Sequence, residues 1–149
     1  MHRRYLPYFL LALGIFLLDQ ATKYFIMHHL NLYQVVKILP SFNIVYYRNV
    51  GSAFGMFKSL GNAFFIVVSL GAIVAISVFI IKDAEARLGL SLILAGAAGN
   101  LADRIIHGYV VDFLEFYAGS FYWPAFNVAD SALTVGITLL IIRTAFGKK

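Results

Sequence analysis

The chain has 149 residues, of which 61% are hydrophobic and 13% are charged, and its mean hydropathy is +0.82. Soluble proteins are about 45–50% apolar and about 25% charged, so this chain has too few polar side chains to cover a globule in water. The net charge of +5 comes from basic residues placed between long apolar runs. This composition excludes a soluble enzyme, a disordered tail and a nucleic-acid-binding module, and it indicates a membrane protein. The absence of Cys excludes disulfides, thiolate metal sites and cysteine nucleophiles.

Four apolar stretches are long enough to cross a bilayer as helices, which takes about 20 residues each. They are residues 5–26, 59–81, 88–106 and 128–146. The first stretch follows basic residues, as the core of a cleaved signal peptide would, but it runs into residues 19–23, which are not a small-residue cleavage site. We therefore expect a retained helix and a single membrane domain over residues 1–149.

The third stretch carries Ser91, Ala95 and Gly99 at four-residue spacing. Small residues on one face allow helices to approach closely in a membrane. We expect this helix to lie at the centre of the bundle.

The distribution of Lys and Arg indicates the orientation. Placing both termini in the cytoplasm puts seven basic residues on the cytoplasmic side and five on the other side. Of those five, Lys23 and Arg104 lie close to an Asp and are candidates for internal ion pairs. We therefore expect residues 27–58 and 107–127 to be extracytoplasmic, and residues 82–87 and both termini to be cytoplasmic.

The first outer segment is rich in β-branched and aromatic residues. Residues 42–47 are typical of a strand, and Leu39-Pro40-Ser41 is typical of a turn before it. The second outer segment is rich in Tyr and Phe and contains Trp123, as expected of a loop in the headgroup region. The fold class is therefore an α-helical integral membrane protein with four transmembrane helices and a small extracytoplasmic β-sheet after the first helix.

Acidic residues gather at the outer ends of the predicted spans. Five of the seven Asp and Glu residues lie there or in the second outer segment: Asp19, Asp103, Asp112, Glu115 and Asp130. An ionisable side chain costs about 2.5–3.5 kcal/mol at the bilayer centre, so those that persist face the protein interior and are functional by default. Glu115 is expected to be a solvated loop residue.

Helical spacing places several of these residues on shared faces. The pairs three or four residues apart are Asp19–Lys23, Asn100–Asp103, Asn100–Arg104 and Asn127–Asp130. Asp19 with Lys23, and Asp103 with Arg104, can also be read as structural ion pairs. Asp112 and Asp130 have no basic neighbour in the sequence, so a purely structural role suits them less well.

Two carboxyl groups held together cannot easily both ionise, so they share a proton. One can then activate water while the other protonates the substrate. We expect Asp112 and Asp130 to form such a pair, because they lie on different segments that enter the same outer face. A zinc site is not expected, since no H-E-x-x-H pair is present. Ser52 with Lys58 is an alternative as a serine–lysine protease, although nothing in the sequence places the two side chains together.

Five short motifs occur in order along the chain: Asp19-Gln20-Ala21-Thr22-Lys23, Asn49-Val50-Gly51-Ser52-Ala53-Phe54, Gly99-Asn100-Leu101-Ala102-Asp103-Arg104, Val110-Val111-Asp112-Phe113 and Phe126-Asn127-Val128-Ala129-Asp130. With them the sequence resembles the lipoprotein signal peptidases (signal peptidase II) of the bacterial inner membrane. The resemblance implies an aspartyl endopeptidase that removes signal peptides from prolipoproteins after a diacylglyceryl group has been attached to their cysteine. It implies no metal, no cofactor and no obligate protein partner; the partners would be lipid-modified prolipoproteins and membrane lipids.

The same resemblance assigns roles to residues. Asp112 and Asp130 correspond to the catalytic pair. The residues implied to position substrate or support the pair are Asp19, Lys23, Asn49, Gly51, Asn100, Asp103, Arg104 and Asn127. The sheet after the first helix would match the family's cradle on the membrane surface, with the active site at the extracytoplasmic face.

Two other functions stay open from the sequence. In a small ion or proton-coupled transporter the acidic residues would form a relay. A relay should reach both sides of the membrane, whereas these residues cluster at one side and the second span has no charge. A structural membrane subunit would not need so many unpaired outer acids.

Overall fold

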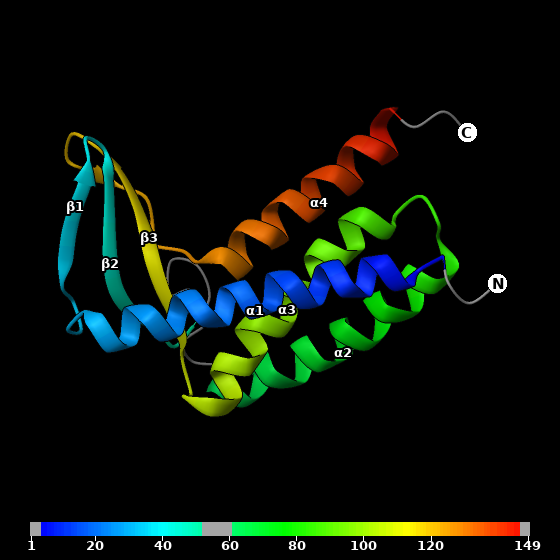
Figure 1. Ribbon diagram of the computed structural model, residues 1–149, viewed down its shortest axis with the longest axis horizontal. Coiled ribbons are helices and arrows are strands. Elements are labelled where there is room, and N and C mark those ends of the chain that lie inside the picture. The colour runs from blue at the N-terminus through cyan, green and yellow to red at the C-terminus, as the bar shows by residue number, and fades with distance from the viewer. Residues whose placement is uncertain (1–3, 52–60, 147–149) are drawn as a thin grey trace.

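The computed structural model describes residues 4–51 and 61–146 (Figure 1). Its elements are α1 (Leu6–His29), β1 (Val35–Leu39), β2 (Phe42–Asn49), α2 (Gly61–Lys82), α3 (Arg87–Ile106), β3 (Val110–Ala118), β4 (Phe121–Tyr122) and α4 (Val128–Phe146). All four helices are long and apolar enough to cross a membrane, which confirms the predicted fold class. Ser52, Lys58 and the expected start of the second span at residue 59 lie outside the described residues.

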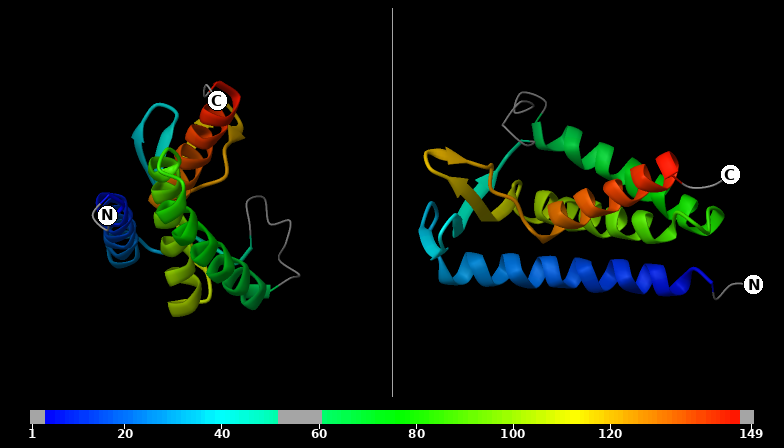
Figure 2. Two further views of the ribbon diagram at one scale, coloured as in Figure 1. Left: turned by 90° about the vertical axis from the view of Figure 1, so that its right-hand side faces the viewer. Right: turned by 90° about the horizontal axis from the view of Figure 1, so that it is seen from above.

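Helix α3 is the centre of the bundle, as predicted, and packs against α1, α2 and α4 (Figure 2). Its contact with α4 is close because glycines face the neighbouring helix. A Cβ on Gly96 would collide with the carbonyl oxygen of Ala129 and with the side chain of Leu133, and a Cβ on Gly136 would lie 2.7 Å from Ile93 Cγ1. These positions therefore require glycine for steric reasons, and the backbones of α3 and α4 meet there.

A four-stranded antiparallel sheet, in the order β1-β2-β3-β4, extends beyond one end of the bundle (Figure 1). The predicted strand and turn are confirmed: β2 begins at Phe42, and Ser41 in the turn has a φ of 72°. A small cluster made of Ile26, Tyr46, Val111 and Phe113 joins the end of α1 to the sheet. The beginning of α1 and the end of α4 lie at the opposite end of the bundle (Figure 1).

Two expectations about the second outer segment were wrong. Residues 107–127 are not a loop, because they supply β3 and β4 to the same sheet as the first outer segment. Glu115 is not solvated: it is 6% exposed and accepts a hydrogen bond of 2.9 Å from Nδ2 of Asn43, the residue opposite it on β2. The pairing partner of β3 lies far earlier in the chain, and local sequence patterns do not reveal such a partner.

The close approach of α3 and α4 gives a first prediction. Gly96→Ala should lower the free energy of unfolding by about 1–3 kcal/mol, because the added methyl group overpacks the contact. Gly14→Ala is the matched control, since nothing lies within 4 Å of its Cβ position. Thermal unfolding in detergent micelles measures both variants. Equal stability of the two variants would contradict this packing.

Candidate active site

The residues singled out in the sequence meet where the bundle joins the sheet. They come from five elements and the segments between them: Asp19 and Lys23 from α1, Asn49 from β2, Asn100, Asp103 and Arg104 from α3, Asp112 from β3, Asp130 from α4, with Gly51 just after β2 and Asn127 just before α4. Hydrogen bonds and ion pairs link all of them into one network, described below. The structure thus brings together residues that are more than 100 positions apart in the chain.

A buried lysine holds one half of this network. Lys23 is 1% exposed, and its Nζ lies 2.8 Å from Asp19 Oδ2 and 3.0 Å from Asp103 Oδ2. It also donates a hydrogen bond of 3.1 Å to Asn100 Oδ1. The three donors of the ammonium group are therefore satisfied, as a buried charge requires. The expected pair of Asp103 with Arg104 is absent from the ion pairs of the described residues, because consecutive helical residues point in different directions.

The two carboxylates paired with Lys23 also hold backbone groups of other elements. Asp19 Oδ1 accepts a hydrogen bond of 2.8 Å from the N–H of Ala129, in the first turn of α4. Asp103 Oδ2 accepts one of 2.9 Å from the N–H of Val111, in β3. Ala129 and Val111 are the residues that immediately precede Asp130 and Asp112. The ion-pair centre therefore fixes the backbone beside both expected catalytic residues.

Gln20 links Asp19 and Asp103 by hydrogen bonds, and our sequence analysis did not identify this residue. Its Nε2 lies 3.1 Å from Asp19 Oδ2 and 3.1 Å from Asp103 Oδ1, and 3.2 Å from the carbonyl oxygen of Gly99. The residue stands inside the first motif, between Asp19 and Lys23. Being uncharged, it gave no electrostatic signal in the sequence, and position in the motif was the one available indication.

Three asparagines hold the carboxyl groups of Asp112 and Asp130. Asp112 accepts hydrogen bonds of 3.0 Å from Asn49 Nδ2 and 2.8 Å from Asn127 Nδ2. Asp130 Oδ1 accepts one of 2.8 Å from Asn100 Nδ2. Within the part of the chain that the structure describes, Oδ2 of Asp130 accepts no hydrogen bond. One carboxylate oxygen thus stays available for another donor.

Asn127 connects the two acids directly. Its side chain is fully buried, its Nδ2 donates to Asp112, and its Oδ1 accepts a hydrogen bond of 2.8 Å from the backbone N–H of Asp130. The second contact is a helix N-cap, because Asn127 immediately precedes α4 and Asp130 is its third residue. This cap explains the three-residue spacing of Asn127 and Asp130 seen in the sequence.

The environment of Asp112 favours its protonated form. The side chain is 3% exposed, and burial, followed by the negative charge of Asp130, raises its pKa from 3.8 to about 7. Hydrogen bonds from Asn49 and Asn127 and the charge of Lys23 oppose this rise. Near neutral pH the pair can therefore hold one proton, which is the state needed for combined acid and base catalysis.

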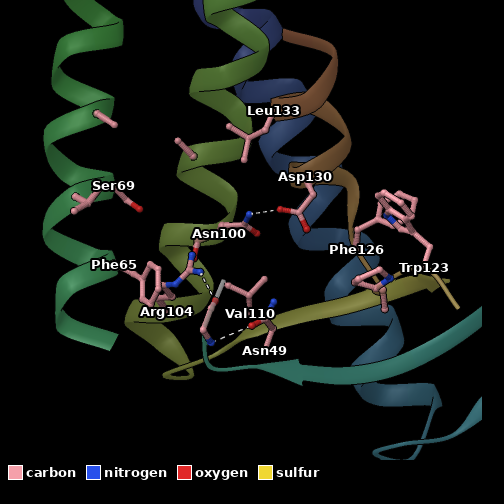
Figure 3. A pocket seen from close by; sticks show the side chains of 16 residues that line it. Asn49, Phe65, Ser69, Asn100, Arg104, Val110, Trp123, Phe126, Asp130 and Leu133 are labelled. Atoms are coloured by element: carbon pink, nitrogen blue, oxygen red, sulfur yellow. Dashed lines mark hydrogen bonds between the residues drawn. The ribbon is translucent and has the colours of Figure 1, made fainter. Parts of the chain in front are cut away.

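A cavity of about 460 Å³ lies in front of Asp130 (Figure 3). Helix α2 forms one wall, α3 forms the floor, and α4 with residues 123–126 forms the other wall. Its polar lining comes chiefly from Asn49, Asn100, Arg104 and Asp130, and most of the remaining lining residues are apolar. Such a cavity suits an apolar ligand whose reacting group lies at one polar end. In the described ranges, 4–51 and 61–146, no group of three His, Asp or Glu side chains could hold a metal ion.

Four helices of membrane-spanning length and composition, with a buried and a half-buried carboxyl group joined through Asn127 beside a mostly apolar cavity, define a multi-pass membrane protein with a candidate catalytic site. The profile of the signal peptidase (SPase) II family matches residues 11–146, and the chain belongs to this family. This confirms the resemblance indicated by the five motifs, and it makes the chain a protease of the membrane.

Known proteins are similar to this chain in sequence and in structure over most of its length. A lipoprotein signal peptidase from Thermodesulfovibrio yellowstonii is 46% identical over 129 residues, covering 87% of this chain and 88% of that protein. One from Alteromonas mediterranea is 40% identical, covering 85% of this chain and 74% of its own. A solved structure of a bacterial membrane enzyme has a TM-score of 0.86 and 34% identity, covering 96% of this chain and 92% of the other.

The ion-pair centre gives a second prediction. Lys23→Met should lower the free energy of unfolding by about 3–5 kcal/mol, because two buried carboxylates lose their cation. Arg143→Met is the matched control: Arg143 forms ion pairs with Asp83 and Glu85 near the surface, and loss of these pairs should lower the free energy of unfolding far less than loss of Lys23 does. Thermal unfolding in detergent compares the variants, and an equal loss in both would show that Lys23 does not hold the site together.

Proposed function

We propose that this protein is an aspartyl endopeptidase of the bacterial cytoplasmic membrane that cleaves signal peptides from diacylglyceryl-modified prolipoproteins. Asp112 and Asp130 are its catalytic residues. The observation that carries the proposal is the joining of these two acids through Asn127, with Asp130 at the polar end of a mostly apolar cavity. Membership of the signal peptidase II family and the printed name of the relatives, lipoprotein signal peptidase, support the substrate.

The mechanism follows from the different surroundings of the two acids. Asp112 carries the proton, because burial raises its pKa to about 7. Asp130 acts as the base through its free oxygen: it takes a proton from water as the water oxygen bonds to the scissile carbonyl carbon. Asp112 gives its proton to the carbonyl oxygen. When the tetrahedral intermediate collapses, Asp112 regains that proton and the leaving amine receives the proton held by Asp130.

The supporting residues act on the pair or on the substrate. Asn49, Asn100 and Asn127 orient the two carboxyl groups. Arg104 and Gly51 line the cavity and position the substrate. The centre formed by Lys23 with Asp19 and Asp103 holds the backbone of β3 and α4. None of these steps requires a metal ion, a cofactor or a second protein.

The cavity suits a substrate that arrives from the bilayer. Its apolar walls come from α2 and α4, which lie on different sides of α3 (Figure 2). The apolar segment of a signal peptide and the acyl chains of the modified cysteine would contact these walls and membrane lipids, while the scissile bond reaches Asp130. Exclusion of bulk water there strengthens the electrostatic interactions of the pair.

The positive-inside rule supports an extracytoplasmic active site. The end of α2, the beginning of α3 and the end of α4 lie away from the sheet (Figure 1). They carry Lys82, Arg87 and Arg143, so this is the expected cytoplasmic end. Residues 27–58 and 107–127 then face the outside. A proton relay fits less well, because the core beneath the site is an apolar cluster that includes Ala12, Ile80, Leu90 and Leu94.

The third prediction concerns the catalytic pair. Asp112→Asn and Asp130→Asn should each reduce cleavage by about 10²–10⁴-fold, because Asn cannot exchange the required proton. The assay uses purified protein in micelles with a diacylglyceryl-modified precursor, and measures release of the signal peptide. Glu115→Gln is the matched control, since Glu115 is a buried acid of the same strand whose hydrogen bond comes from Asn43 and not from Asn127, which joins the pair.

Three outcomes would contradict this proposal. Turnover near that of the parent in either Asn variant would place the chemistry elsewhere. Loss of cleavage with chelators and its return with added zinc would show a metal enzyme. Equal rates for precursors with and without the diacylglyceryl group would exclude the proposed substrate class.

A further inference from the structure

Helix α2 contacts Arg104 at two points, and nothing in its sequence indicated this. The ring of Phe65 lies beside the guanidinium group, with Cζ 4.9 Å from the ring centroid (Figure 3). Asn62 Nδ2 donates a hydrogen bond of 2.9 Å to the backbone carbonyl oxygen of Arg104. Asn62 and Phe65 are three residues apart, so they lie on the same face of α2. This face is turned toward α3 and the cavity.

The guanidinium group of Arg104 has no carboxylate partner among the ion pairs of the described residues. Its hydrogen bonds go to two backbone carbonyl oxygens, those of Asn100 at 3.4 Å and Gly51 at 3.3 Å. Both are long for such bonds. An arginine has five N–H donors on a flexible side chain, so donors remain for a ligand in the cavity, but these contacts alone fix the group weakly.

The aromatic ring of Phe65 adds a further contact that restrains the guanidinium group of Arg104. A guanidinium within about 6 Å of a ring centroid is attracted by the negative face of the ring, and Arg also stacks on aromatic planes. In the described part of the chain, the substantial helix contacts of α2 are with α3. Through its contact with Arg104, α2 therefore reaches the polar end of the site.

We propose that Phe65 and Asn62 are positioning residues for Arg104, which hold its guanidinium group at the cavity wall in the orientation that binds the substrate. The inference rests on the proposed function and deepens it, because it assigns α2 a role in the reaction beyond that of an apolar wall. Phe65 acts on the guanidinium group of Arg104. Asn62 acts on the backbone carbonyl group of Arg104.

The test is a double-mutant cycle on cleavage of the diacylglyceryl-modified precursor. Phe65→Leu should lower kcat/KM about five- to tenfold by removing the cation–π contact. Phe65→Tyr and Phe65→Trp keep an aromatic face and should retain most of the activity. With Arg104→Gln as the background, Phe65→Leu should change kcat/KM by no more than about twofold, because no cation remains to be held.

The control is Phe79→Leu, the same substitution in α2 at a position that is 57% exposed and far from the cavity, and it should match the parent. The inference is overturned if Phe65→Leu cleaves like the parent, or if it causes the same loss with and without Arg104. If Phe65→Leu does not fold, Asn62→Ala replaces it in the double-mutant cycle. This variant must then lower kcat/KM when Arg104 is present and leave kcat/KM within about twofold when Arg104 is replaced by Gln. A parent protein that does not cleave the modified precursor would instead overturn the proposed function.

Discussion

The ion pairs of Lys23 inside the protein are the interaction on which the site depends. A buried ammonium group is tolerated because Asp19 and Asp103 neutralise it and an amide oxygen completes its hydrogen bonds. The other hydrogen bonds of these two carboxylates hold Ala129 and Val111, the residues immediately before the proposed catalytic aspartates. One cation therefore determines how α1 and α3 meet, and also where β3 and α4 present their acids.

The four aspartates of the network divide into two kinds because of their surroundings. Asp19 and Asp103 each contact the cation directly. Asp112 and Asp130 are held by neutral asparagine amides instead, so their mutual repulsion and burial are only partly compensated. Carboxyl groups in such different environments take different chemical roles. The same kind of side chain thus supplies a structural centre and the proposed proton-exchanging pair within one small region.

Hydropathy and small-residue spacing were enough to predict the four helices and the central position of α3. The pairing of β3 with β2 could not be predicted, because the partners are far apart in sequence, and for this reason the burial of Glu115 was missed. Spacing along a helix suggested Asp103 with Arg104, but the partner of Asp103 comes from another helix. Gln20 and Phe65 carry no charge, and their roles depend on contacts between helices that a single sequence does not show.

The proposed mechanism requires that Asp112 hold a proton near neutral pH, and infrared difference spectroscopy detects such a proton. A protonated carboxyl group has its own C=O band, and raising the pH from about 5 to about 9 should remove one such band with a midpoint near the pKa of Asp112, which is about 7. The band should be missing in Asp112→Asn and unchanged in Asp83→Asn, since the exposed Asp83 has its pKa lowered by Arg143. If the spectrum near pH 7 contains no protonated carboxyl band that depends on Asp112, the aspartate is ionised at rest and cannot be the proton donor of this mechanism.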